Sequence, residues 1–176
     1  AFGMANGLPI TDPASGYDPA NPLENRDPRL RMTFYFEGDP YDGGVIDDGE
    51  FGGVCCNGST KLMANFGIAP VFPRKLTADP DLTPEAFAQM NGIEFGSPID
   101  LVIYRYADIL LAHAEALNES GDTAGAYAGI NKVRNRAGLP DLAAGLSKAA
   151  MKDAILQERR VELALEGKRF YDLKRA

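Results

Sequence analysis

The sequence predicts a mostly α-helical protein in which helical hairpins carry a long loop-rich segment. Eleven of the twelve prolines and thirteen of the nineteen glycines lie before residue 99, where turn signals recur every few residues. From residue 97 onward the apolar residues follow the helical period of 3.6. We therefore divide the chain into a loop-rich segment with short strands, residues 1–96, and a helical scaffold, residues 97–176, both belonging to one domain.

The loop-rich segment contains two strand-like runs. LRMTFYF at residues 30–36 and GVIDD at residues 44–48 are rich in residues that favour extended structure, and turn residues flank them. We expect Phe34 and Phe36 to lie in the core. The remaining residues predict an irregular segment that packs on the helices.

The first predicted helix starts at Ser97. Ser97 can act as the N-cap, Pro98 suits the first helical position, and Asp100 favours the positive end of the helix dipole. We expect the helix to run to about Asn118. Its apolar stripe has the i, i+3, i+4 spacing of a buried face and consists of Ile99, Val102, Ile103, Tyr106, Ile109, Leu110, Ala114 and Leu117.

A second helix follows after a two-residue link. Gly121 ends the first helix, Asp122 can cap the second, and Gly138 is the expected left-handed residue after its last turn. One face of this helix carries Ala126, Ile130 and Val133. The short link predicts an antiparallel hairpin, and its small residues resemble one tetratricopeptide-type repeat.

A third helix begins near Ser147 and is expected to continue to Gly167, which has the position of a C-terminal glycine. The following KRFYDLKRA predicts a further turn or helix. The second half of the chain is therefore expected to be entirely helical.

Composition excludes several classes of function. A net charge of −7 and a pI near 4.7 provide no basic surface for a nucleic acid backbone. No apolar run is long enough to cross a bilayer, and the first residues lack the features of a signal peptide. Because the chain starts with Ala and stops just after an amphipathic segment, we expect a longer protein around it. Cys55 and Cys56 are sequence neighbours and are expected to be free thiols.

Three glutamates four residues apart, Glu158, Glu162 and Glu166, raise the possibility of catalysis or metal binding. A di-metal site needs histidines beside its carboxylates, and the only histidine, His113, lies at the edge of the apolar stripe, where a packing role is expected. Glycoside hydrolysis needs carboxylates on opposite sides of a bond, whereas Glu158 and Glu162 project from one helix face. The sequence also lacks a G-x-S-x-G elbow, a phosphate-binding loop and an EF-hand.

A structural role explains the glutamates better. Glu158 falls among apolar residues of the third helix, and a buried carboxylate needs a cation and hydrogen bonds. Spacing predicts that Glu162 pairs with Arg159, that Glu166 pairs with Arg169, and that Arg169 pairs with Asp172. Arg105 on the first helix could also reach this line. We interpret these residues as an ion-pair network that holds helices together.

Four stretches of the chain resemble the SusD/RagB family of outer-membrane lipoproteins. They are NPLENRDPRL (21–30), YRYADILLAHAEALNESGD (104–122), INKVRNRAGL (130–139) and ILQERRVELALEGKRFYDLKR (155–175). They occur in the family's order, and together they are similar to the middle and C-terminal portion of a family member.

The resemblance implies a SusD-like fold of tetratricopeptide-like hairpins with long loops on the ligand side. It implies a protein without catalytic residues, metal or cofactor that binds oligosaccharides or other nutrients on the surface of Bacteroidetes-type bacteria. It also implies a SusC-like TonB-dependent transporter as partner, and anchoring in the outer membrane through an N-terminal lipidated cysteine. Neither Cys55 nor Cys56 has the position of that cysteine.

The resemblance also gives a set of structural motif residues. They are Asn25, Arg26, Asp27, Pro28, Arg29, Arg105, Glu115, Glu158, Arg159, Glu162, Glu166, Arg169 and Asp172. We hypothesise that Arg105 or Arg26 neutralises the line from Glu158 to Glu166. An unchanged melting temperature in Glu158→Gln would contradict this pairing.

Ligand-binding residues are expected in the loop-rich segment. Sugar faces stack on aromatic rings, while sugar hydroxyls bond to planar polar groups. The residues that combine these properties are Tyr41, Phe51, Phe66 and Phe72, with Asp42, Asp47 and Asn57 nearby. The alternative is that these rings only pin the loops to the helices. Two other functions stay open, a generic helical-repeat scaffold for protein interactions and a glycoside hydrolase.

Overall fold

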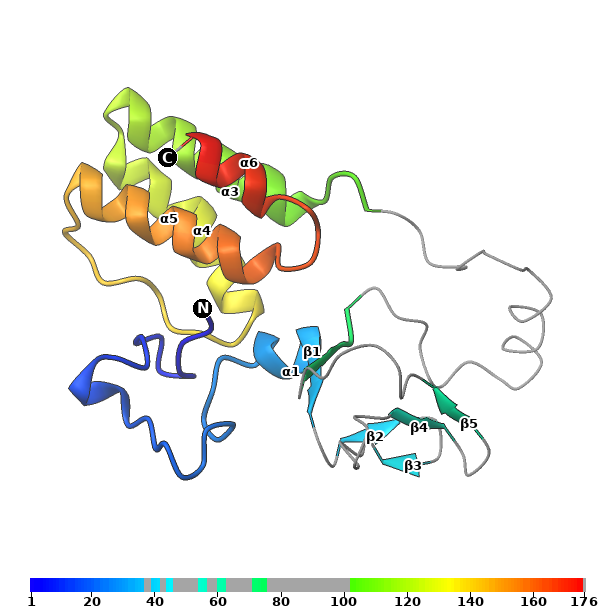
Figure 1. Cartoon of the computed structure of the whole chain (residues 1–176). Coiled ribbons are helices and arrows are strands. Elements are labelled where there is room, and N and C mark those ends of the chain that lie inside the picture. Colours follow the sequence, from blue (N-terminus) through cyan, green and yellow to red (C-terminus); the bar gives the residue numbers. More distant parts are fainter. Residues whose placement is uncertain are drawn as a thin grey trace. The chain divides into compact units, whose positions relative to one another are not determined.

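The computed structural model describes residues 1–36, 39–41, 44–45, 54–56, 60–62, 71–75 and 102–175. Its fold is mostly α-helical, as predicted, with short paired strands (Figure 1). The chain forms two compact units, of which the first comprises Ala1–Leu30 and Val102–Ala176 and the second comprises Arg31–Leu101. The first thirty residues thus group with the helices, whereas the sequence-based division placed them in the loop-rich segment.

Helices α3 (Tyr106–Ser120) and α4 (Thr123–Arg136) form the predicted antiparallel hairpin. Gly121 between them has a φ of 99°, and the Asp122 side chain caps α4 by accepting a hydrogen bond of 2.8 Å from the Gly125 backbone N–H. Gly138 adopts the left-handed φ expected after α4. The sequence therefore predicted this hairpin and its caps correctly.

The two helices of the hairpin approach closely because residue 129 has no side chain. A Cβ atom on Gly129 would lie 2.8 Å from the Leu110 carbonyl oxygen and 3.2 Å from the Ala114 Cβ. The core of the first unit, called the helical unit below, surrounds this crossing. Its buried side chains are Ala107, Leu111, Ala114, Ala126, Ile130, Val133, Met151 and Ile155.

Helix α5 (Lys148–Glu162) packs against α3 and α4 and begins where the sequence predicts, with the Ser147 hydroxyl accepting from the Ala150 backbone N–H. It ends five residues before the predicted stop at Gly167. Turns follow it, Leu165 has a φ of 66°, and the chain enters α6 (Arg169–Arg175). Glu166 therefore lies in a turn between the two helices.

The predicted start of the first helix was wrong. Residues 102–105 are not helical, Arg105 is extended with φ −140° and ψ 164°, and α3 begins at Tyr106. Ser97, Pro98 and Asp100 lie outside the described residues. The Arg105 side chain contacts Glu162 and Glu166, and the extended backbone places it there.

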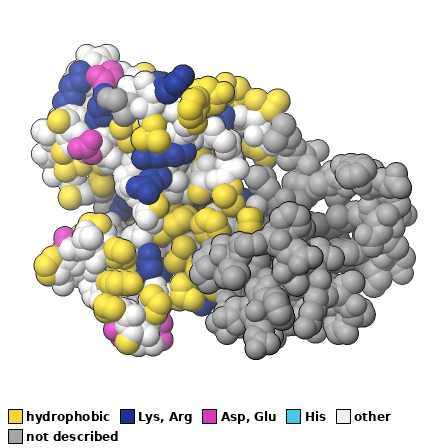
Figure 2. Space-filling model, in the orientation of Figure 1, with side chains coloured by type: hydrophobic (Ala, Val, Ile, Leu, Met, Phe, Trp, Pro, Cys, Tyr) yellow, Lys and Arg dark blue, Asp and Glu magenta, His cyan; other side chains and the backbone are white. Residues whose placement is uncertain are grey.

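The predicted apolar stripe was only partly correct. Ala114 is buried and Leu110 and Leu117 are partly buried against the core, but Ile103, Tyr106 and Ile109 are more than half exposed. Helix α6 also exposes Phe170, Tyr171 and Leu173. Hydrophobic side chains accordingly gather at the surface over α6 and the start of α3 (Figure 2). His113 is exposed as well, not packed at the edge of the core.

Residues 1–30 form an irregular segment that its own hydrogen bonds hold together. Before residue 29 its one short helical element is the 3₁₀ helix η1 (Pro13–Ser15). The Arg26 guanidinium donates to the carbonyl oxygens of Phe2, Gly3 and Pro22. Asn25 has a φ of 53°, a conformation that asparagine tolerates better than most residues.

The described residues of the second unit form three antiparallel strand pairs. They are β1 (Phe34–Phe36) with β6 (Val71–Pro73), β2 (Pro40–Tyr41) with β3 (Gly44–Val45), and β4 (Val54–Cys56) with β5 (Thr60–Leu62). The run at residues 30–36 is only half a strand, because α1 (Arg29–Thr33) occupies its first part. Tyr35 is the buried residue of β1, whereas Phe34 and Phe36 are partly exposed.

Candidate functional site

The glutamate line is buried at the centre of the helical unit. Glu158 and Glu162 on α5 are 4% and 3% exposed, and the Glu166 side chain in the following turn is equally enclosed. Burying a carboxylate is costly unless cations and hydrogen-bond donors compensate its charge. Arginines from several elements provide this compensation.

Arg29 of α1 contacts two of the glutamates at once. Its Nη1 atom donates to Glu158 Oε1 and, over 3.0 Å, to Glu162 Oε2. Its Nε and Nη2 atoms donate to the Asp27 carboxylate over 3.0 and 2.8 Å. All these side chains are almost fully buried, so one guanidinium joins residues 27–29 to α5.

Arg105, ahead of α3, contacts the other end of the line. Its Nε atom donates to both oxygens of Glu166, and its Nη1 and Nη2 atoms donate to the side chain and the carbonyl of Glu162, each over 2.6 Å. The hypothesis named Arg105 or Arg26 as the cation of this line. Arg105 does contact the glutamates. Arg26 instead donates to backbone carbonyl groups, and Arg29 is the second arginine that contacts the glutamates.

Two arginines of α4 also contact these glutamates. Together with Arg29 and Arg105 they form a first cluster of charges around Glu158 and Glu162. Arg134 Nη1 lies 3.3 Å from Glu158 Oε2, and Arg136 Nη2 donates to Glu162 Oε1. Sequence reasoning did not single out these two residues. The signal was present, because Arg134 lies one turn after Ile130 and directly after Val133 on the predicted buried face.

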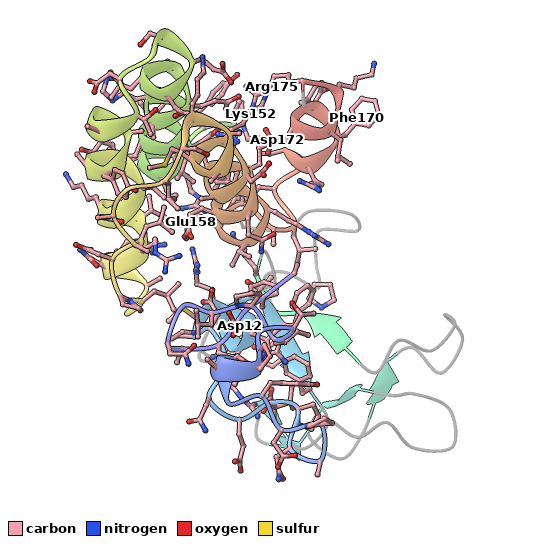
Figure 3. All side chains as sticks on the ribbon, turned by 90° about the vertical axis from the view of Figure 1, so that its left-hand side faces the viewer. Asp12, Lys152, Glu158, Phe170, Asp172 and Arg175 are labelled. Atoms are coloured by element: carbon pink, nitrogen blue, oxygen red, sulfur yellow. The ribbon has the colours of Figure 1, made fainter. Side chains whose placement is uncertain are left out.

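A second cluster joins α3, α5 and α6. Arg159 donates to Asp108 over 2.9 Å and to Asp172 over 3.0 Å, and Lys168 Nζ lies 3.0 Å from Asp108. Burial would raise the pKa of Asp108, but the hydrogen bonds and charges of Lys168 and Arg159 outweigh it and lower the pKa. Arg175 links Asp172 to Glu115. Figure 3 shows Asp172 and Arg175 on α6 beside α5, with Phe170 pointing away.

The pairs that spacing predicted along the chain were wrong. Arg159 pairs with Asp108 and Asp172 in place of Glu162. Arg169 is exposed and belongs to no ion pair within the described part of the chain. The partners come from other elements because a buried charge is compensated most fully by groups that converge on it from several sides.

This geometry does not resemble a pair of catalytic carboxyl groups. A general acid needs a carboxyl group with a raised pKa. Burial would raise the pKa of Glu162, but the hydrogen bonds from Arg105 and Arg29 keep it below its ordinary value of 4.5. The described residues also contain no group of His, Cys, Asp or Glu side chains that could hold a metal ion, and none of the helices among them could span a membrane.

The expected ligand-binding residues are largely outside the described part of the chain. Tyr41 belongs to β2, and Phe72 belongs to β6, where it pairs with Tyr35. Cys55 and Cys56 belong to β4. The expected site residues that fall outside the described residues are Asp42, Asp47, Phe51, Asn57 and Phe66.

Comparison with known proteins identifies similar chains. A family model described as the SusD family matches residues 1–176. Two SusD-like proteins of Formosa agariphila are 35% identical over 107 residues and 40% identical over 93 residues. These matches cover 56% and 48% of this chain but only 21% and 18% of the relatives, so the chain spans about a fifth of their length.

Solved structures give the same result for the fold. A SusD-like protein of Bacteroides fragilis has a TM-score of 0.64 at 27% identity, and the match covers 99% of this chain and 34% of that one. A SusD-like carbohydrate-binding protein of the same species has a TM-score of 0.66 at 27% identity, with coverage of 99% and 33%. The chain corresponds to about a third of each of these structures.

Proposed function

Because this chain belongs to the SusD family, whose model matches all of its residues, we propose that it binds an oligosaccharide or another nutrient at the cell surface. The observation that carries this proposal is the similarity to a SusD-like carbohydrate-binding protein over 99% of the chain. Glycan binding is thus the function that the family favours.

The proposed role is binding without cleavage. The buried carboxylates support it, because Glu158 and Glu162 both accept hydrogen bonds from Arg29 and are enclosed by further arginines. A glycoside hydrolase needs two carboxyl groups across an accessible cleft. The ion pairs of α5 serve to hold helices together instead.

We assign ligand contacts to the loop-rich segment. The proposed residues are Tyr41, Phe51, Phe66 and Phe72 for stacking and Asp42 and Asn57 for hydrogen bonds. Aromatic rings can stack on the apolar face of a sugar, and planar polar side chains can bond its hydroxyl groups.

Delivery to a TonB-dependent outer-membrane transporter of the SusC type completes the proposal. The protein would then act at the extracellular face of the outer membrane, held there by a lipid anchor. The runner-up function is a helical scaffold for protein interactions. The exposed Phe170, Tyr171 and Leu173 of α6 support it, because exposed apolar groups often mark protein contacts.

Isothermal titration of the folded chain with a panel of neutral oligosaccharides tests the proposal, with product analysis of the same samples. We expect saturable heat without cleavage, lost in Tyr41→Ala or Phe51→Ala and retained in the control Phe170→Ala. Cleaved product would contradict binding without catalysis. Absence of heat with every glycan would contradict glycan binding by this chain.

A further inference from the structure

A pocket of about 490 Å³ lies in the helical unit, between the first eleven residues and the side of α5 that carries Gln157, Glu158 and Val161. This volume is within the range of roughly 300–1,000 Å³ typical of small-molecule sites. In Figure 3 the Glu158 side chain lies between α5 and the segment that carries Asp12. The lining residues given for this pocket all belong to the first unit.

Arg134 gives the pocket a hydrogen-bond donor. Its side chain is only 10% exposed, Nε donates to the Pro140 carbonyl over 2.9 Å, and Nη1 lies 3.3 Å from Glu158. Among the described residues, no acceptor bonds to Nη2. Nη2 is not one of the fully buried side-chain atoms without a partner, so it is open to the pocket that Arg134 lines, and this corner suits a ligand that carries an acceptor oxygen.

Gly7 keeps this donor accessible. A Cβ atom at residue 7 would lie 2.6 Å from Arg134 Nη2, and the φ of 83° is one that glycine adopts readily. The Gly7 backbone therefore passes close to the guanidinium without a side chain that would fill this corner.

The charges of the pocket lining balance. Arg29 and Arg134 face the carboxylates of Asp27 and Glu158, and each of the two arginines contacts at least one of them. An anionic or cationic ligand would disturb these pairs, so the pocket favours a neutral ligand. The apolar part of the lining includes Phe2, Leu8, Ile10 and Val161.

We propose that this pocket binds one neutral, pyranose-sized sugar unit, with a ring hydroxyl oxygen accepting a hydrogen bond from Arg134 Nη2. The inference rests on the proposed function, glycan binding, and adds a second contact site to it. A pyranose has an apolar C–H face for the wall of Phe2 and Leu8 and hydroxyl groups for the polar corner. Gln157 and Thr11, which also line the pocket, offer further hydrogen-bonding groups.

The test is an NMR titration of the chain with ¹⁵N-labelled arginine side chains, using methyl α-glucopyranoside, methyl α-galactopyranoside and methyl α-mannopyranoside as probes. We expect at least one methyl glycoside to shift the Arg134 Nε–H signal in a saturable manner. Glucuronate and glucosamine, which are charged sugars of the same size, should bind at least about tenfold more weakly.

Two variants locate the effect. Arg134→Lys keeps a cation beside Glu158 but removes Nη2, and Ile10→Trp fills the pocket from a position that is 36% exposed while leaving Arg134 intact. Each should weaken binding of the methyl glycoside about tenfold or more, followed through the Arg29 Nε–H signal in Arg134→Lys. The matched control Met32→Trp, 62% exposed in α1, should bind as the unaltered chain does.

Unchanged affinity in Ile10→Trp, or the absence of any methyl glycoside response at Arg134, would overturn the proposed pocket. The oligosaccharide titration separates the two proposals. Heat that is lost in Tyr41→Ala but kept in both pocket variants would leave glycan binding intact and refute the pocket alone. Absence of heat with the unaltered chain would refute glycan binding itself.

Discussion

Glu162 accepts hydrogen bonds from three arginines that belong to three different parts of the fold. Arg29 comes from α1, Arg105 precedes α3, and Arg136 ends α4. A single carboxylate therefore joins the segment 1–30, the hairpin and α5. Its charge has to be present for these contacts to hold.

Acid should therefore weaken the fold through Glu162. Its pKa in the folded protein lies below 4.5, so its ionised form contributes stability above pH 4.5, and this contribution is lost as the pH falls through the folded-state pKa. We expect the free energy of unfolding in urea to fall between pH 5 and pH 3. Glu162→Gln should be less stable by about 3 kcal/mol at pH 7 and should lose less on acidification.

Glu24→Gln is the matched control for this pH dependence, because Glu24 is exposed. Its stability curve should run parallel to that of the unaltered chain. If Glu162→Gln also ran parallel to the unaltered chain between pH 5 and pH 3, Glu162 would not be a source of the acid sensitivity.

At the scale of elements, the crossing of α3 and α4 depends on residue 129. A larger side chain there meets the backbone of α3, which cannot move as a flexible side chain does. We expect Gly129→Leu to lower the free energy of unfolding by about 1–3 kcal/mol, measured by urea unfolding. Ala128→Leu, at the neighbouring exposed position of α4, should stay within about 0.5 kcal/mol. Equal losses in both variants would show that the crossing is not tightly packed.

The same helices show how far the sequence predicts the elements. The boundaries of α4 and the start of α5 follow from local signals, Asp122, Gly138 and Ser147, and these predictions were confirmed. The start of α3 and the end of α5 do not follow from local signals. Arg105 is extended and its Nη2 atom bonds the Glu162 carbonyl at the last turn of α5, so a contact between distant residues sets both boundaries.

The candidate site was likewise predicted only in part. The position of Glu158 among apolar residues predicted a buried carboxylate, and Glu158 is 4% exposed. The arginines that neutralise Glu158 and Glu162 lie up to 133 residues away, and no local spacing specifies them. The loop residues assigned to the ligand remain a prediction, because their side chains lie outside the described part of the chain.

At the scale of the helical unit, Arg29 joins residues 1–30 to α5. We expect Arg29→Met to accelerate hydrogen exchange of the Met4, Ala5 and Asp27 amides, which donate to backbone carbonyls within the segment. The Ile130 amide in the centre of α4 should change less. Leaving Glu158 and Glu162 without this cation removes the link between segment and helix.

Arg31→Met is the control for this exchange experiment, because the Arg31 side chain is half exposed and pairs with Asp39 in the second unit. It should leave the exchange of Met4 and Ala5 unchanged. Equal acceleration of Met4 and Ile130 in Arg29→Met would show that residues 1–30 open only together with the whole helical unit.

The separation of Arg29 from its partners also has a consequence during synthesis on the ribosome. Glu158 follows Arg29 after 129 residues, and at 5–20 residues per second it is added roughly 6 to 26 seconds later. During this interval the nascent chain holds Arg29 and Asp27 with only each other as partners. Residues 1–30 can therefore make these contacts with α5 only after α5 has been translated and has left the exit tunnel.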